Sequence, residues 1–243
     1  MNNNGQSAAS NLSKEQIQVL LTGKFGDGCF AVNSRAKYHP EWNFNIHYQT
    51  NSINKDYLEF KKSLLGDLVI SDIKSICNSG YKKSTIYTLA TKCDSEITKL
   101  SQLNIEESLK LMDELGLALW FYDDGSLHKT KEFYNLNTHA FSKEVQEDVI
   151  IPFLKNKFNI SAKLTKEVKQ DGRIFWYLRI GKFDGAFIIT DILSKYYIES
   201  YSYKIISSET IQRWSKLQEQ LKSEDISNLT SRQLSCKLRK IEI

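Results

Sequence analysis

The sequence predicts an α+β fold made of two similar halves, and three observations support this prediction. An apolar stretch that ends in an acidic residue and glycine occurs twice, as LLTGKFGDG at 20–28 and LALWFYDDG at 117–125. The acidic residues Asp27 and Asp124 lie 97 positions apart, and each is followed by strand, helix, hairpin and helix patterns in the same order. The link between the repeats is short and apolar, which favours one fused body over two tethered domains.

The composition is that of an ordinary globular protein with enough residues for a core. The chain has 243 residues, of which 41% are hydrophobic and 26% charged. It has no run of about 18 apolar residues, and its polar start lacks the apolar segment of an export signal, so we expect an intracellular, non-secreted protein without membrane partners. The four cysteines form no C-x-x-C pair, which indicates free thiols. A net charge of +4 permits nucleic-acid binding but argues for it only weakly.

The first half is expected over 14–104, after an unstructured lead at 1–13. Ser13 is a suitable N-cap for the motif helix, and beyond Gly28 the apolar residues alternate with the period of two that is typical of strands. The expected elements are a helix at 14–26, strands at 30–33 and 43–49, a helix at 56–65, strands at 68–77 and 85–90, and a helix at 94–100.

The second half is expected over 105–221, with a C-terminal extension at 222–243. Ser142 is a suitable N-cap, and the Asp171-Gly172 pair is a strong signal for a hairpin turn. The expected elements are a helix at 105–123, strand-like sequence at 127–140, a helix at 142–158, a hairpin of 162–169 and 173–181, and helices at 184–197 and 207–221.

The acidic ends of the two apolar stretches suggest a functional site. A carboxylate at the C-terminal end of a helix is unfavourable, because the helix dipole is already negative there. The glycine that follows is a natural helix stop, since it takes the left-handed conformation without a clash. Two such carboxylates brought together would suit a divalent metal held near a phosphate.

The stretches 117–125 and 20–28 resemble the two motifs of the LAGLIDADG homing endonucleases, in the single-chain form that carries both. The ending WFYDDG at 120–125 is similar to an aromatic-rich group of that family, and Ser202–Ile205 resembles the group's lysine-bearing segment. The similarity covers nearly the whole chain after residue 14. It implies two pseudo-symmetric αββαββα halves, whose eight strands form a β-saddle over DNA and whose motif helices pack at the centre.

Small residues in both motifs are compatible with that close packing. Thr22 and Gly26 are four apart on one face of the first helix, and Gly116 and Ala118 offer little bulk at the start of the second. Lys24 departs from the family pattern, where an apolar residue is usual. It either extends towards solvent or indicates a different register within the helix.

The resemblance also implies the residues of the catalytic site. By their place in the motifs, Asp27 and Asp124 would hold the metal, with Gly26 and Asp123 beside them; Asp123 is mainly expected to bind neighbouring backbone or basic groups. Mg²⁺ is the expected cofactor, with Mn²⁺ as a substitute. Lys204 matches the family's catalytic lysine in the second half.

The catalytic lysine of the first half stays open between three residues. Lys99 is the best candidate, because the counterpart should precede the second motif helix. The sequence departs from the family here, since the stretch between Lys99 and the motif is short and lacks the usual proline. Lys82 and Lys83 therefore remain competitors.

DNA recognition is expected from one polar and basic face of each sheet, because alternate strand residues share a face and a two-stranded ribbon fits the major groove. The expected DNA-binding residues are Asn33, Arg35, Lys37, His47 and Gln49, with Asn45, in the first half, Lys129, Lys131, Asn135 and Asn137 after the second motif, and Lys163, Thr165, Lys169, Arg173, Tyr177 and Arg179 in the hairpin. The competing interpretation is that these are simply the solvated faces of half-buried sheets.

The predicted function is a site-specific endonuclease that binds double-stranded DNA as a monomer and cuts a long asymmetric site. Two alternatives share the scaffold: an RNA maturase that binds its intron RNA, and a DNA-binding protein that does not cut. The acids retained at both motif ends favour the nuclease. Unrelated enzymes are disfavoured because the sequence has no phosphate-cradling glycine loop, nucleophile elbow or zinc motif, and its histidines lack metal-ligand spacing.

Overall fold

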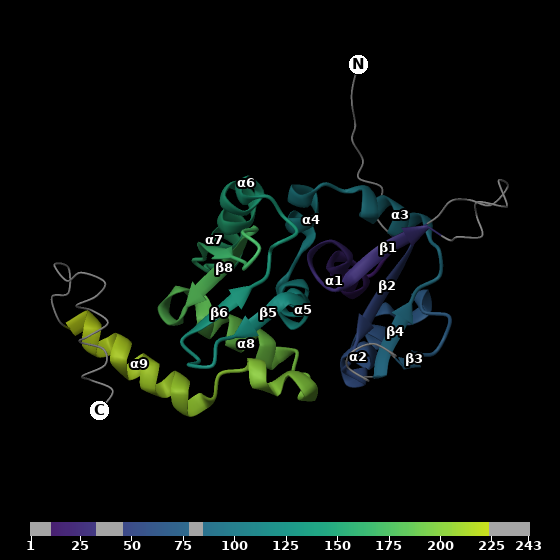
Figure 1. The fold of residues 1–243 in the computed structure, drawn as a ribbon. Coiled ribbons are helices and arrows are strands. Elements are labelled where there is room, and N and C mark those ends of the chain that lie inside the picture. Colours follow the sequence, from purple (N-terminus) through teal and green to yellow (C-terminus); the bar gives the residue numbers. More distant parts are fainter. Residues whose placement is uncertain (1–10, 33–45, 78–84, 224–243) are drawn as a thin grey trace, which may run out of the picture.

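The computed structural model describes residues 11–32, 46–77 and 85–223, and confirms an α+β fold of two similar halves (Figure 1). The first half consists of α1 (Lys14–Phe25), β1 (Gly28–Val32), β2 (Ile46–Ser52), α2 (Lys55–Leu65), η2 (Gly66–Leu68), β3 (Lys74–Cys77), β4 (Thr85–Ala90) and α3 (Ser95–Gln102). A short helix, α4 (Ile105–Leu111), leads into the second half.

The second half consists of α5 (Glu114–Asp124), β5 (Gly125–Leu127), β6 (Phe133–Leu136), α6 (Lys143–Val145), η3 (Gln146–Ile150), α7 (Ile151–Phe158), β7 (Lys163–Val168), β8 (Ile174–Gly181), η4 (Lys182–Ala186), α8 (Phe187–Lys195), η5 (Glu199–Lys204) and α9 (Ser208–Ser223). Its antiparallel sheet has the strand order β5-β6-β8-β7, which repeats the order β1-β2-β4-β3 of the first half. The identical topology confirms the predicted duplication.

The motif helices α1 and α5 pack against each other between the two sheets (Figure 1). Both are buried on nearly all sides, and the rings of Phe25 and Trp120 meet at 5.0 Å between centroids. Close approach depends on glycine, because a Cβ at Gly26 would overlap the carboxylate of Asp123. At the other end of the pair, Gly116 leaves room for the side chain of Gln18. The predicted central packing of small residues is thus confirmed at these two positions.

Several helix starts follow the sequence signals, but one predicted helix is broken. Ser13 caps α1 in a reciprocal box with Gln16, and Ser142 caps α6, as predicted. The helix predicted over 105–123 is wrong, because the chain leaves the helical conformation at Met112. The Asp113 carboxylate then accepts hydrogen bonds from the N–H groups of Leu115 and Gly116 and starts α5 as a separate helix.

Two predicted strand segments are shorter than expected. The strand predicted over 68–77 begins only at Lys74, since η2 turns the chain at Gly66–Leu68. The strand-like sequence at 127–140 is a tight hairpin of β5 and β6, in which Lys131 takes a left-handed conformation with φ of 59°. The hairpin predicted at Asp171-Gly172 is confirmed, and Gly172 supplies the positive φ of 79° that its turn requires.

Neither glycine that follows the motif acids takes the left-handed conformation predicted for a helix stop. Gly28 starts β1, and Gly125 starts β5 with φ of −81° and ψ of 146°. Both positions are instead too crowded for a side chain: a Cβ would meet the Tyr48 ring at Gly28 and the Phe121 carbonyl at Gly125. These glycines let a strand leave a tightly packed helix end.

Candidate active site and nucleic-acid interface

The two motif carboxylates lie at the paired ends of α1 and α5, close enough to affect each other's ionisation. Asp27 is exposed and Asp124 is half-buried. Burial raises the pKa of Asp124 to about 7, and the negative charges of Asp27 and Asp123 add to the effect, while Lys204 and Lys61 oppose it. Although Asp27 is exposed as a residue, partial removal of its carboxyl from water, followed by the charge of Asp123, also raises its pKa. Burial is thus the main reason that both carboxyls hold their protons to higher pH, and the neighbouring acids add to it.

The carboxylates of Asp27 and Asp124 supply only part of the oxygen shell of a hard divalent cation, and DNA phosphates and water would have to supply the rest. Within the described ranges 11–32, 46–77 and 85–223, no group of three or more His, Cys, Asp or Glu side chains is arranged to hold a metal alone. Mg²⁺ and similar ions need only one or two carboxylates when phosphate oxygens and water complete the shell. Asp27 and Asp124 meet that requirement, and a shared cation would relieve the repulsion from Asp27 that adds to the effect of burial on the pKa of Asp124.

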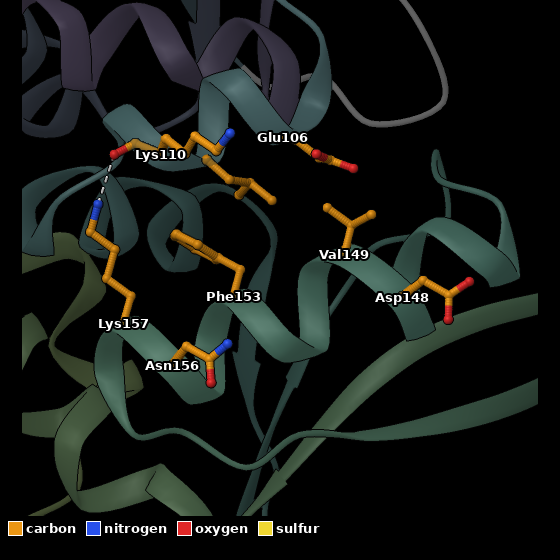
Figure 2. A pocket seen from close by; sticks show the side chains of 8 residues that line it. Glu106, Lys110, Asp148, Val149, Phe153, Asn156 and Lys157 are labelled. Atoms are coloured by element: carbon orange, nitrogen blue, oxygen red, sulfur yellow. Dashed lines mark hydrogen bonds between the residues drawn. The ribbon is translucent and has the colours of Figure 1, made fainter.

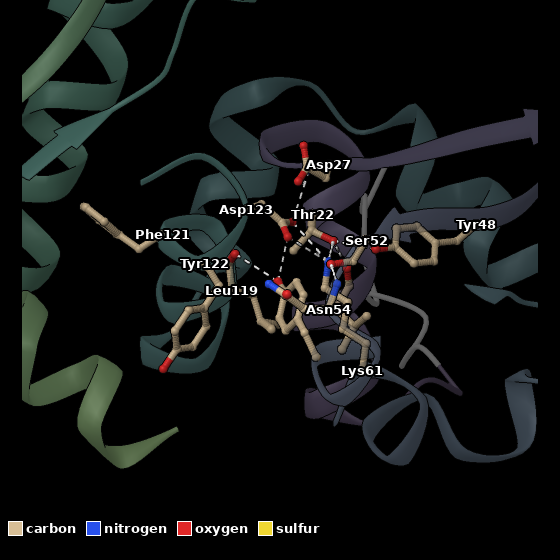
Figure 3. A network of polar contacts seen from close by, with 12 residues as sticks. Thr22, Asp27, Tyr48, Ser52, Asn54, Lys61, Leu119, Phe121, Tyr122 and Asp123 are labelled. Carbon is tan, nitrogen blue, oxygen red and sulfur yellow. Dashed lines mark hydrogen bonds and ion pairs between the residues drawn. The ribbon is translucent and has the colours of Figure 1, made fainter. Parts of the chain in front are cut away.

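Asp123 has other partners for both of its oxygens (Figure 3). The Lys61 Nζ lies 3.1 Å from each carboxylate oxygen, and both side chains are fully buried. The Tyr57 hydroxyl donates to Oδ1 at 2.6 Å, and the backbone N–H of Asp27 donates to Oδ2 at 3.2 Å. The expectation that Asp123 binds neighbouring backbone and basic groups agrees with this geometry, whereas a metal-binding role would have to displace these contacts.

Lys204 reaches the site from η5 and is buried. Its Nζ donates hydrogen bonds to the carbonyl oxygens of Phe121 at 3.1 Å and Tyr122 at 2.6 Å, near the C-terminal end of α5. Burial lowers the pKa of Lys204 to about 8, although the charges of the three motif-end acids oppose this change. The lysine predicted for the second half therefore lies close enough to Asp124 and Asp27 for their charges to affect its pKa.

The structure does not bring Lys99 to the carboxylates. Lys99 lies on the exposed side of α3, where its Nζ pairs with Glu96 at 2.6 Å. The competitors Lys82 and Lys83 lie outside the described residues. Lys24 donates to the carbonyl oxygens of Ser101 and Leu103, which explains a lysine at that motif position without a change of register.

The cation that α2 supplies to the site is Lys61, which the sequence reading missed. A signal was present: Tyr57, Leu58, Lys61 and Leu65 form the buried face of α2, and a lysine in such a face requires a partner. Its acceptor, Asp123, lies 62 positions away, so the local sequence could not identify it.

Five of the predicted DNA-binding residues of the second half lie on one face of its sheet. Arg179 lies opposite Lys163 on one side and Asn135 on the other, and Thr165 lies opposite Tyr177, so these five side chains share a face. Arg179 donates to the Tyr177 hydroxyl at 2.9 Å and to Asn135 Oδ1 at 3.4 Å. Its guanidinium also lies 4.4 Å from the centre of the Phe133 ring, which the prediction did not include.

The other predicted residues of this half lie at the sheet margins. Lys169 and Arg173 flank the β7–β8 turn, where they pair with Glu167 at 2.6 Å and Asp171 at 2.7 Å. The remaining three are placed in exposed connections rather than in strands: Lys129, Lys131 and Asn137.

The first-half sheet has a more neutral face. His47 lies opposite Ala31 and Gln49 lies opposite Cys29, so the two predicted residues share one side of β2. Sequence reading missed three polar residues that the register places on this side: Asn51, Lys74 and Thr88. The predicted Asn33, Arg35, Lys37 and Asn45 lie outside the described residues.

A separate pocket of about 380 Å³ lies between α4 and the helix formed by η3 and α7 (Figure 2). Its walls combine the apolar Leu109, Val149 and Phe153 with charged groups, and Lys157 donates to the Lys110 carbonyl at 2.9 Å beside it. Neither motif acid lines it. In the part of the chain that the structure describes, every helix is too short or too polar to span a membrane.

The fold and the paired acidic helix ends define a LAGLIDADG-type protein. The profile of the LAGLIDADG DNA endonuclease family matches residues 19–186, so the chain belongs to that family. This confirms the resemblance inferred from the two motifs and the predicted class of enzyme.

A curated relative is similar in sequence, and two solved structures share the fold. A probable intron-encoded DNA endonuclease 3 from Mycosarcoma maydis is 27% identical over 122 residues, which are 50% of this chain and 84% of that protein. The homing endonuclease I-WcaI bound to its DNA recognition sequence shares the fold with a TM-score of 0.63 and 23% identity, covering 80% of this chain and 87% of that one. A variant of I-DmoI in complex with its target DNA and manganese matches with a TM-score of 0.50 and 16% identity, covering 74% and 95%.

Proposed function

We propose that this protein is a single-chain homing endonuclease that cuts both strands of a long, asymmetric DNA site. The observation that carries the proposal is the pairing of Asp27 and Asp124 at adjacent ends of α1 and α5, one from each half. Two unequal halves in one chain suit an asymmetric target, with one chain per duplex. The names of the similar proteins support DNA as the substrate and an intron as a setting.

A divalent metal is the proposed cofactor, with Mg²⁺ as the expected ion and Mn²⁺ as a substitute. When bound, it would supply an activated water and stabilise the oxygens of the scissile phosphate. Asp27 and Asp124 would hold it, and the manganese present in the I-DmoI complex supports this choice of ion class. Lys204 has three ammonium donors, of which two bind helix carbonyls, so one remains for a phosphate oxygen.

The strand faces are proposed to read the DNA. Arg179 is held by Tyr177 and Asn135 before any DNA binds, which would reduce the entropy lost when it contacts a base. The second half exposes more positive charge on its sheet than the described part of the first half does, so it would contribute more of the salt-sensitive affinity.

The proposal is tested by selecting cleaved sites from a randomised duplex library with Mg²⁺ present. We expect one asymmetric consensus sequence, cut on both strands by the wild-type protein. The Asp27→Asn and Asp124→Asn variants should bind the selected site in Ca²⁺ but not cut it. Failure of the wild-type protein to enrich any site, or binding of two chains to a palindromic site, would contradict the proposal.

A further inference from the structure

The carboxylate of Asp123 is a buried charge that links the two halves of the protein (Figure 3). Asp123 comes from α5 of the second half, whereas its partners Lys61 and Tyr57 come from α2 of the first half. Asp27 follows α1 and donates its backbone N–H to the same carboxylate at 3.2 Å. One side chain thus connects three segments at the point where the motif helices end.

A contribution to folding stability does not explain the Lys61–Asp123 ion pair well. Both side chains are fully removed from solvent, and such pairs are often no more stabilising than apolar residues of similar size. The carboxylate also lies at the C-terminal end of α5, where the helix dipole disfavours a negative charge. These unfavourable features point to a role in geometry.

Contacts from Lys61 and Tyr57 restrict the orientation of the Asp123 carboxylate. Lys61 spans both carboxylate oxygens at 3.1 Å, and the Tyr57 hydroxyl binds Oδ1 at 2.6 Å, so the carboxylate plane has little freedom to rotate. Lys61 is itself held against the Tyr57 ring, 4.5 Å from its centre. Oδ2 is therefore presented to the Asp27 N–H at a defined place.

The same arrangement does not exist for Asp124. Its backbone belongs to the last turn of α5, whereas Asp27 lies beyond the end of α1, after the extended residue Gly26. Asp27 thus has a contact from the other half at its backbone N–H, and Lys61 holds the carboxylate that accepts it.

We propose that the Lys61–Asp123 ion pair positions Asp27 for metal binding, an inference that rests on the metal-dependent cleavage proposed above. Lys61 and Asp123 are positioning residues here and do not touch the reacting atoms. Loss of the pair should weaken the Asp27 side of the site more than the Asp124 side. Asp27 and Asp124 approach the shared cation from opposite halves, so a displaced Asp27 should leave the two scissile phosphates unequally placed, and the two strands should be cut at more unequal rates.

The test compares two neutral replacements of the pair that differ in a single property. Lys61→Met with Asp123→Asn keeps an oxygen that can accept the Asp27 N–H, whereas Lys61→Met with Asp123→Leu removes it. Both avoid an unpaired buried charge, and Tyr57 keeps the Leu119 carbonyl as an acceptor at 3.3 Å. Lys62→Met is the matched control, because Lys62 lies next along α2 and pairs with exposed Asp72.

Three quantities are measured for each variant. Urea unfolding gives the stability, and DNA binding at increasing Ca²⁺ gives the metal requirement without cleavage. Cleavage of a supercoiled plasmid that carries the selected site gives separate rates for nicking and for linearisation. We expect the leucine variant to need about 10- to 100-fold more Ca²⁺ and to accumulate nicked circles, the scale seen when outer partners of metal ligands are removed. The asparagine variant should be closer to the wild-type protein in its Ca²⁺ requirement and its two cleavage rates. The Lys62→Met variant should equal the wild-type protein in both.

Equal Ca²⁺ requirements and equal ratios of the two cleavage rates in the asparagine and leucine variants would overturn the positioning role. The same holds if activity follows stability alone and both strands slow together. A wild-type protein that cuts no selected site would instead contradict the proposed function, so the two failures are distinguishable.

Discussion

Replacing Asp124 with asparagine is expected to stabilise the metal-free protein at neutral pH but not at pH 4. The pKa of Asp124 is raised from its ordinary 3.8 to about 7 by burial and by the charges of Asp27 and Asp123. The folded state therefore binds a proton more tightly than the unfolded chain does. The contribution of Asp124 to the free energy of unfolding is therefore largest below about pH 3.8, is lost as the pH rises towards 7, and stays absent above it. Asparagine does not ionise and escapes this loss.

The size of the effect follows from the span of the pKa change. At about 1.4 kcal/mol for each pH unit, the full span from 3.8 to about 7 corresponds to roughly 4 kcal/mol. Asp124 is only half-buried, so solvent screening reduces the expected gain to about 2 kcal/mol at pH 8. The measurement is urea unfolding of both proteins in a metal chelator from pH 4 to 8.

A surface variant controls for general effects of the substitution. Asp72 is exposed, and its hydrogen bond with Lys62 holds its pKa below the ordinary value. Asp72→Asn should therefore give no gain at neutral pH. An equal change in stability at pH 4 and pH 8 for Asp124→Asn, or a loss of stability at pH 8, would contradict the unfavourable burial of the Asp124 charge.

Three further predictions concern cleavage, packing and recognition. Lys204→Met should slow single-turnover cleavage about 10²-fold, because one stabilising charge beside the phosphate is lost. An unchanged rate would show that Lys204 has no catalytic role. Gly26→Ala should lower the free energy of unfolding by about 1–3 kcal/mol, since the new Cβ overlaps the Asp123 carboxylate; a neutral result in urea unfolding would contradict the tight helix packing. Arg179→Ala should cost about 1–3 kcal/mol in DNA affinity and relax one base position, whereas Lys169→Ala should weaken all sites alike and reduce the salt slope by about one; binding titrations at several salt concentrations distinguish the two.

Local signals in the sequence were sufficient for much of the fold. Ser13 and Ser142 each precede a helix with the right capping chemistry, and Asp171-Gly172 specifies a hairpin turn, so these boundaries were predictable. The repeat of the acidic motif located Asp27 and Asp124 because the same pattern recurs at a fixed distance. Each of these features depends on residues close together in the chain.

The parts that were missed depend on residues far apart in the chain. Lys61 is an ordinary helix residue until α5 brings Asp123 against it, and no local pattern pairs α2 with the end of α5. The break before α5 was overlooked because no glycine or proline marks it. Asp113 makes the break by capping the new helix, a signal that was present but weak beside the long apolar pattern.

We propose that Asp27 and Asp124 form one metal-dependent site for cutting both strands of DNA. The most direct test is to incubate the selected duplex site with the wild-type protein, Asp27→Asn or Asp124→Asn in Mg²⁺, after matching their DNA affinities in Ca²⁺. We expect double-strand breaks with the wild-type protein and none with either variant. A single variant that still cuts both strands at the wild-type rate, with affinity unchanged, would contradict it.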